Sequence, residues 1–176
     1  MPITIDYLSL DTKTTWVEVV IDPKDPSAGS VKLKIKDIPW AKWQSLQIEL
    51  LAAQQALATC IEHVQREGSD RTASVKYGEG LQRVITAQTE MIRWGVCGHD
   101  EIVTQQGPVP FESASMSFDG VPYEVAAPSM LLLYSRLGVR PSRPMTFVAE
   151  AALAVARVQS GEAWPTADER WAAGKS

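Results

Sequence analysis

A stretch with neither glycine nor proline runs from Trp40 to Arg66 and sets the strongest constraint on the fold. Its large apolar residues recur at intervals of three, four and seven, which places them on one face of an α-helix. These residues are Trp43, Leu46, Leu50, Leu57, Ile61 and Val64. Gly68 follows, and glycine commonly ends a helix. The sequence therefore predicts one long helix with an apolar stripe.

A second helix is predicted from about Gly80 to Trp94, because its apolar residues again recur with a helical period. Gly78 and Gly80 weaken helix propensity, so we place its start there. A short polar segment, 66–70, separates the two helices. Helices joined by a short link usually pack antiparallel, so we expect a helical hairpin.

Two segments near the N-terminus predict a β-hairpin, 15–21 and 31–36, because apolar and polar residues alternate in both. A loop with two prolines and a glycine separates them. Lys32, Lys34 and Lys36 lie on the face opposite the apolar one, as in edge strands that lysines protect from aggregation. Trp16 shares a strand face with Glu18, so we expect it to be exposed unless a helix or a partner covers it.

The second half of the chain predicts another hairpin and further helices. Asp119-Gly120 separates two strand-like segments, 115–118 and 121–125, and is a strong hairpin-turn signal. Helices are expected at 130–137 and 145–159. The predicted fold class is therefore α+β, mainly helical, with an N-terminal β-hairpin and a second short hairpin between helices. We expect a single domain over 1–176, with the hairpin at 15–36, a helical body at 38–160 and a C-terminal tail at 161–176.

Composition argues against several classes of function. With 17 Lys and Arg against 21 Asp and Glu, the net charge of −4 does not favour a nucleic-acid binder. No apolar stretch is long enough to span a membrane, and the first ten residues lack the pattern of a signal peptide. Two cysteines make no disulfide framework. We therefore expect a cytoplasmic protein with neither membrane nor specific nucleic-acid partners.

Four residues could in principle hold zinc: Cys60, His63, Cys97 and His99. Cys60 and His63 share a helical face, but Cys60 also suits a small core residue between Leu57 and Ile61. Cys97 near His99 suggests a catalytic thiol, yet proximity in the sequence shows neither a lowered thiol pKa nor a base within reach. We therefore expect no metal, no cofactor and no catalytic residue.

Several motifs resemble those of tailed-bacteriophage tail assembly chaperones, in which a β-rich N-terminal segment precedes helices. The similar segments are 91–100, 109–111, 118–123 and 129–134. The resemblance implies a non-enzymatic protein in the host cytoplasm that holds the long hydrophobic helices of the tape measure protein before the tail tube polymerises. A homo-oligomer is also compatible with it.

Partner binding is then expected at the helical stripe or at the exposed hairpin face. The predicted partner-binding residues are Trp16, Trp43, Leu46, Leu50, Leu57 and Ile61. Two alternatives stay open. A structural virion subunit, such as a connector or tail-associated protein, would join its neighbours by strand addition. A small zinc- or thiol-dependent enzyme would use the four Cys and His residues.

Overall fold

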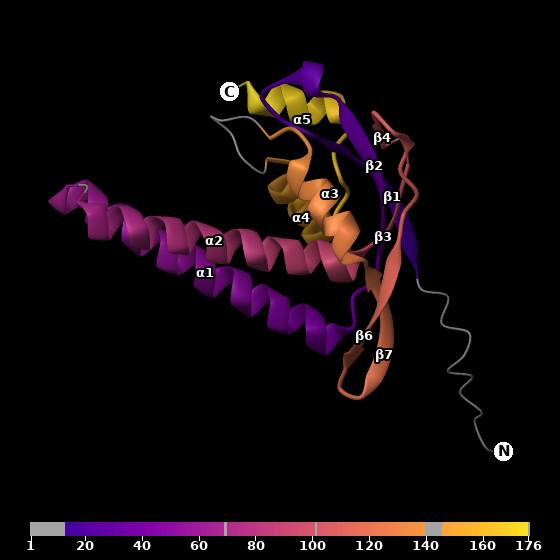
Figure 1. The fold of residues 1–176 in the computed structure, drawn as a ribbon, viewed down its shortest axis with the longest axis horizontal. Helices are drawn as coiled ribbons and strands as arrows, with labels where there is room; N and C mark the ends of the chain where they lie inside the picture. Colours follow the sequence, from indigo (N-terminus) through magenta and orange to yellow (C-terminus); the bar gives the residue numbers. More distant parts are fainter. Residues whose placement is uncertain (1–12, 69, 101, 140–145, 176) are drawn as a thin grey trace.

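The computed structural model describes residues 13–68, 70–100, 102–139 and 146–175. It confirms the α+β, mainly helical class (Figure 1). In chain order the elements are β1 (Thr14–Val20), the 3-10 turn η1 (Pro26–Ala28), β2 (Ser30–Lys36), α1 (Trp40–Glu67), α2 (Arg71–Gly95), β3 (Val96–Asp100), β4 (Val103–Thr104), β5 (Gly107–Pro108), β6 (Ser113–Phe118), β7 (Val121–Ala126), α3 (Pro128–Arg136), α4 (Thr146–Gln159) and α5 (Ala167–Gly174).

The predicted N-terminal hairpin is confirmed, and a third strand extends it. β1 pairs with β2 and β2 pairs with β3, all antiparallel, in the order β1-β2-β3. The apolar residues of the hairpin, Val17, Val19, Val31, Leu33 and Ile35, are buried on one face. β3 was not predicted because it begins directly at the end of α2 and contains no alternating pattern.

The second predicted hairpin is confirmed as β6 and β7, in a separate two-stranded sheet. Its turn residues Asp119 and Gly120 both have positive φ, 51° and 74°. That combination is the type I′ geometry, which matches the twist of the two strands. Pro122 lies in β7 opposite Ser117, which is tolerated because a two-stranded sheet has only edge strands.

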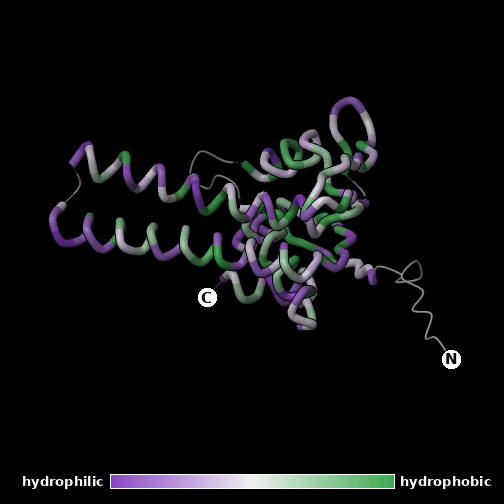
Figure 2. Tube along the Cα trace, turned by 90° about the horizontal axis from the view of Figure 1, so that it is seen from below, coloured by the Kyte–Doolittle hydropathy of each residue, from purple (hydrophilic) through white to green (hydrophobic). Residues whose placement is uncertain are grey.

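α1 and α2 form an arm that projects from the rest of the protein (Figure 1). Hydrophobic residues recur along both of its helices (Figure 2). The least exposed residues of α1 follow a heptad spacing, and so do those of α2. This seam consists of Trp43, Leu46, Leu50, Ala53, Leu57, Cys60 and Val64 in α1, and of Ala73, Gly80, Val84, Ala87, Met91 and Trp94 in α2. The arm is therefore an antiparallel two-helix coil, as the sequence predicted.

The predicted start of the second helix was wrong. α2 begins at Arg71, where the Asp70 carboxylate caps it by accepting a hydrogen bond from the Ala73 N–H at 2.6 Å. Gly80 lies inside α2, at a point where α2 packs closely against Leu57 of α1. A Cβ at Gly80 would lie 3.6 Å from the Leu57 Cα, so a large side chain could not fit at this position.

α3, α4 and α5 pack beside the three-stranded sheet and complete the core (Figure 1). α4 provides several of the most buried residues, including Phe147, Ala151 and Val155. The predicted tail contains α5, which begins with a capping box between Thr166 and Glu169. Of the predicted helix 145–159, residue 145 lies outside the described residues. Across the described parts of the chain, no helix has the length and hydropathy needed to cross a bilayer.

Candidate protein-binding surfaces

The structure separates the predicted partner-binding residues into buried and exposed groups. Trp43 and Leu46 lie in the core, with 4% and 1% of their surface exposed, and Leu50 and Leu57 are half-buried. All four belong to the seam that faces α2, and the burial of Trp43 and Leu46 makes these two unavailable to a partner in this fold. Periodicity identified the stripe correctly, but it does not say whether the covering helix comes from the same chain.

Trp16 is 53% exposed, on the face of the β1-β2-β3 sheet opposite the core. It is paired with Lys34 of β2, which is paired with Gly98 of β3. The Lys34 ammonium lies 5.8 Å from the centre of the indole ring. A Cβ at Gly98 would lie 4.0 Å from the Trp16 Cη2, so the indole reaches across the sheet towards this glycine. Trp16 thus forms an aromatic surface beside a basic side chain.

The free edge of β1 is partly covered by the protein itself. The Trp164 indole N–H donates a hydrogen bond to the Glu18 carbonyl at 2.8 Å. Directly after β1, the Thr146 hydroxyl donates to the Ile21 carbonyl at 2.9 Å. A strand added here would have to displace the first of these contacts. This arrangement does not favour the strand-addition alternative.

A groove near the tip of the arm combines residues from both helices. It has a volume of about 440 Å³ and is lined by Ile61, Val64, Gln65, Ser74 and Tyr77. Ile61 and Tyr77 are exposed, and none of the five lining residues is charged. Tyr77 was not among the predicted binding residues, because the second helix was predicted to begin at about Gly80. The signal was nevertheless present, since Tyr77 continues the heptad of Gly80 and Val84 by one step.

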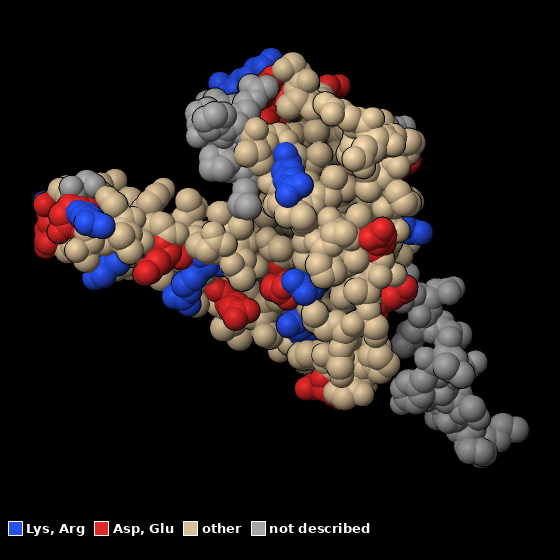
Figure 3. Space-filling model, in the orientation of Figure 1, with Lys and Arg blue, Asp and Glu red and all other residues tan. Residues whose placement is uncertain are grey.

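The other side of the arm has a different character. A groove of about 400 Å³ there is lined by the charged residues Glu49, Arg83 and Glu90, with Ala53 and Ala87 among the remaining residues. Figure 3 shows acidic and basic side chains together along the face of the arm that it draws. The two grooves flank the seam on opposite sides. Ile61 directly follows the seam residue Cys60 in α1, whereas Glu49 directly precedes the seam residue Leu50. An apolar partner therefore fits only the first groove.

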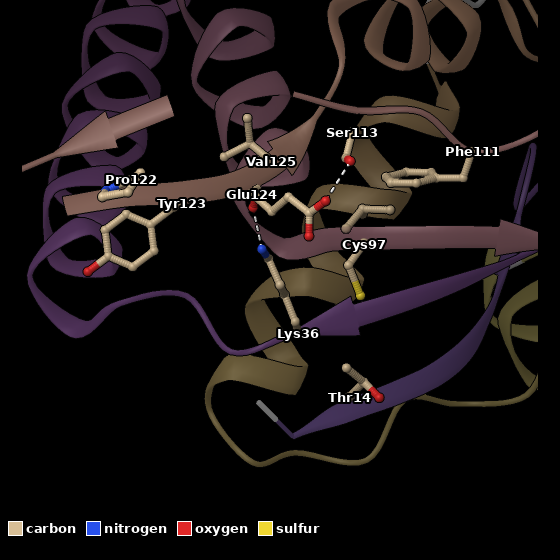
Figure 4. A pocket seen from close by; sticks show the side chains of 10 residues that line it. Thr14, Lys36, Cys97, Phe111, Ser113, Pro122, Tyr123, Glu124 and Val125 are labelled. Atoms are coloured by element: carbon tan, nitrogen blue, oxygen red, sulfur yellow. Dashed lines mark hydrogen bonds between the residues drawn. The ribbon is translucent and has the colours of Figure 1, made fainter. Parts of the chain in front are cut away.

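A cavity of about 420 Å³ lies between the three-stranded sheet and the β6-β7 hairpin. Lys36 of β2, Cys97 of β3 and Glu124 of β7 face it (Figure 4). The Lys36 ammonium donates a hydrogen bond to the Glu124 carbonyl, and the Ser113 hydroxyl donates to the Glu124 carboxylate at 2.8 Å. The pairing of β2 with β3 shifts at Lys34 and Ile35, and Cys97 is the extra residue of this bulge. A β-bulge changes the direction in which a side chain points, which accounts for Cys97 facing the cavity.

Burial raises the pKa of the Cys97 thiol above its ordinary value, and the nearby Lys36 ammonium offsets part of that effect. Burial likewise lowers the pKa of Lys36, and the Cys97 thiolate, when it forms, and the Glu124 carboxylate offset part of this. A nucleophilic cysteine needs the opposite shift, a lowered thiol pKa. The cavity therefore holds a thiol that is protected rather than activated.

His99 is half-buried and is held by hydrogen bonds at both of its ring nitrogens. Nε2 lies 2.7 Å from the Val109 carbonyl, which can only accept, so Nε2 carries the proton. Nδ1 then accepts from the Tyr134 hydroxyl at 2.8 Å. Because neither nitrogen is left to accept a further proton from a thiol, His99 cannot serve Cys97 as a general base in this arrangement.

The four candidate zinc ligands do not converge. Cys60 lies in the arm seam, with its thiol 3.9 Å from the Lys76 carbonyl, and His63 pairs with Glu67 on the surface of α1. Cys97 and His99 lie in β3, where they contact different groups. Among the described residues, no three His, Cys, Asp or Glu side chains are grouped so that they could bind a metal.

Comparisons of the chain with protein-family models, with curated proteins and with solved structures find no match.

Proposed function

We propose that this protein is a non-enzymatic phage tail assembly chaperone that holds an apolar helix of the tape measure protein at the tip of its arm. The observation that carries the proposal is the uncharged groove lined by Ile61, Val64 and Tyr77 on an arm that projects from the body. Grooves of this kind accept the apolar face of an amphipathic helix. The motif resemblance in segments 91–100, 109–111, 118–123 and 129–134 points to the same class of protein.

Energetics favour reversible binding. Each large apolar side chain that a partner helix buries in the groove contributes about 1.5–3 kcal/mol before entropic costs. Two or three such contacts give a modest affinity after those costs are subtracted. A chaperone that must release its client before the tail tube forms needs this property. Two observations support the non-enzymatic part of the proposal: the pKa of the Cys97 thiol is raised, and both ring nitrogens of His99 are already hydrogen-bonded.

The test is co-expression with the tape measure protein of the same genome, followed by affinity capture and by measurement of how much tape measure protein stays soluble. We expect capture, and we expect Tyr77→Asp to abolish it, because a carboxylate in the groove would have to be desolvated. Val103→Asp is the control, since Val103 is an exposed apolar residue, 68% exposed against 41% for Tyr77, and lies in β4, outside the arm.

No capture by the native protein, or equal capture by both variants, would contradict the proposal. Presence of the protein in purified particles at a fixed copy number would favour the structural virion subunit instead.

A further inference from the structure

The outer face of α1, the side turned away from α2, is unusual for a solvent-exposed helix. Between Trp40 and Ile61, 14 residues are exposed, and Glu49 is the only charged one among them. Protein surfaces carry roughly 25–35% charged residues, so about four would be expected. Ile48 and Leu51, with 70% and 55% of their surface exposed, lie in the middle of this face. A helix face of this composition is typical of an interface.

The outer face also has a heptad spacing of its own. Ala41, Gln44, Ile48, Leu51, Gln55 and Ala58 follow one another at intervals of three and four. This second stripe lies opposite the seam that α2 covers, so α1 has two faces suited to helix packing. The exposed positions that flank the second stripe, including Gln47, Ala52 and Gln54, are also uncharged. The second stripe is therefore a site for another helix.

We propose that a second copy of this chain covers the outer face, with the two α1 helices packed antiparallel about a twofold axis. One register of such a pair is self-complementary. It places Ile48 against Leu51 of the partner subunit, Gln44 against Gln55 of the partner subunit, and Ala41 against Ala58 of the partner subunit. Apolar residues then meet apolar ones at the centre, the glutamine amides can hydrogen-bond to each other, and small residues meet at the ends.

The direction and the strength of the pairing follow from the same residues. The antiparallel arrangement opposes the dipoles of the two helices, whereas a parallel pair would align them. The overlap from residue 41 to residue 58 is about 27 Å long. It engages about a dozen residues per subunit, roughly half the 20–30 of a standard interface. The dimer is thus a reversible one that forms at micromolar or higher concentration.

The test is sedimentation velocity over a concentration series from the low micromolar range to several hundred micromolar. We expect a monomer–dimer equilibrium, and we expect Ile48→Glu to weaken it at least about tenfold, because two carboxylates would meet apolar side chains at the centre. Leu132→Glu is the matched control, since Leu132 is 53% exposed on α3, outside the arm. Unchanged circular dichroism must accompany both variants.

A charge exchange tests the register. In Gln44→Lys combined with Gln55→Glu, opposite charges face each other twice across the twofold axis, so the dimer should persist. In Gln44→Glu combined with Gln55→Glu, like charges face each other and the dimer should be lost. Equal behaviour of these two variants would overturn the register.

Two results would overturn the dimer itself: a native protein that stays monomeric at every concentration, or an Ile48→Glu variant that dimerises like the native protein. If the native protein is monomeric and Ile48→Glu abolishes capture of the tape measure protein, the outer face binds that partner instead. Loss of capture in Tyr77→Asp with dimerisation intact would separate the two surfaces.

Discussion

Replacing Arg170 by alanine should destabilise the protein substantially, because it would leave a carboxylate buried without its partner. Arg170 lies in α5 and donates hydrogen bonds to Glu150 of α4, from Nε to Oε2 at 3.0 Å and from Nη2 to Oε1 at 2.5 Å. Glu150 is only 8% exposed. The guanidinium also lies 5.5 Å from the centre of the Trp164 ring, so one side chain holds α5, α4 and the 160–166 segment together.

The size of the effect can be estimated from this geometry. Removing one partner of a buried ion pair typically costs about 3–5 kcal/mol. Undocking of α5 would let water reach the Glu150 carboxylate, so the cost cannot exceed the free energy that holds this short helix in place. We therefore expect a loss near the lower end, about 3 kcal/mol. For a chain of this length that corresponds to a fall in melting temperature of roughly 6–12 °C.

Urea unfolding followed by circular dichroism measures the loss, and Arg157→Ala is the matched control. Arg157 lies 5.9 Å from the same Trp164 ring, but its ion-pair partner Glu162 is on the surface. Its removal should cost only about 0–1 kcal/mol. Replacing Glu150 and Arg170 together by methionine should recover most of the stability, because no unpaired charge remains. Equal losses in Arg170→Ala and Arg157→Ala would refute the reasoning.

Three further predictions concern backbone packing and alkaline stability. Gly78→Ala should raise the free energy of unfolding by about 0.5–1 kcal/mol, since Gly78 lies inside α2 and no side chain or other element lies within 4 Å of the added Cβ. Gly95→Ala should lower it by about 1–3 kcal/mol, because the Cβ would lie 2.6 Å from the Val155 Cγ1; equal effects in the urea assay would contradict both. Burial raises the pKa of Tyr134 above its ordinary value of 10.0, so the stability it contributes is complete below pH 10 and is lost as pH rises through the raised pKa. An absorbance titration should show one tyrosine ionising only as the protein unfolds, and Tyr134→Phe should remove that step; ionisation of every tyrosine before unfolding would contradict the prediction.

Much of the fold could be predicted because its signals are local. The Asp119-Gly120 turn has the one backbone geometry that these two residues favour, and the alternation from Val31 to Lys36 fixes which side of β2 is buried. The start of α2 could not be predicted from propensity, because two glycines argue against a helix there. Asp70 and the close packing of Gly80 on Leu57 stabilise the helix in spite of them.

The candidate site could be predicted only in part, because a periodic stripe does not say what covers it. Trp43 and Leu46 belong to the apolar stripe predicted for the first helix, and the structure buries both of them. Strand alternation placed Trp16 on the face of β1 opposite the core but did not say whether a helix covers it, and the structure leaves it 53% exposed. The exposure of Tyr77 and of the outer face of α1 can be recognised only when it is known which element packs against each face of each helix. Local patterns therefore located the arm, while the three-dimensional packing located its free surfaces.

The arm has a further property that links its two free surfaces. In the distal half of the arm, α1 and α2 pack mainly against each other, and the seam changes from buried residues such as Leu46 to half-buried ones such as Leu57 and Val64. A two-helix coil of this kind has little apolar burial and hence low local stability. Any helix that covers the groove at Tyr77 or the stripe at Ile48 adds burial to the same pair of helices. If the two proposed interfaces form, both add burial to the same two helices, so a client in the groove would strengthen the dimer and the dimer would strengthen client binding.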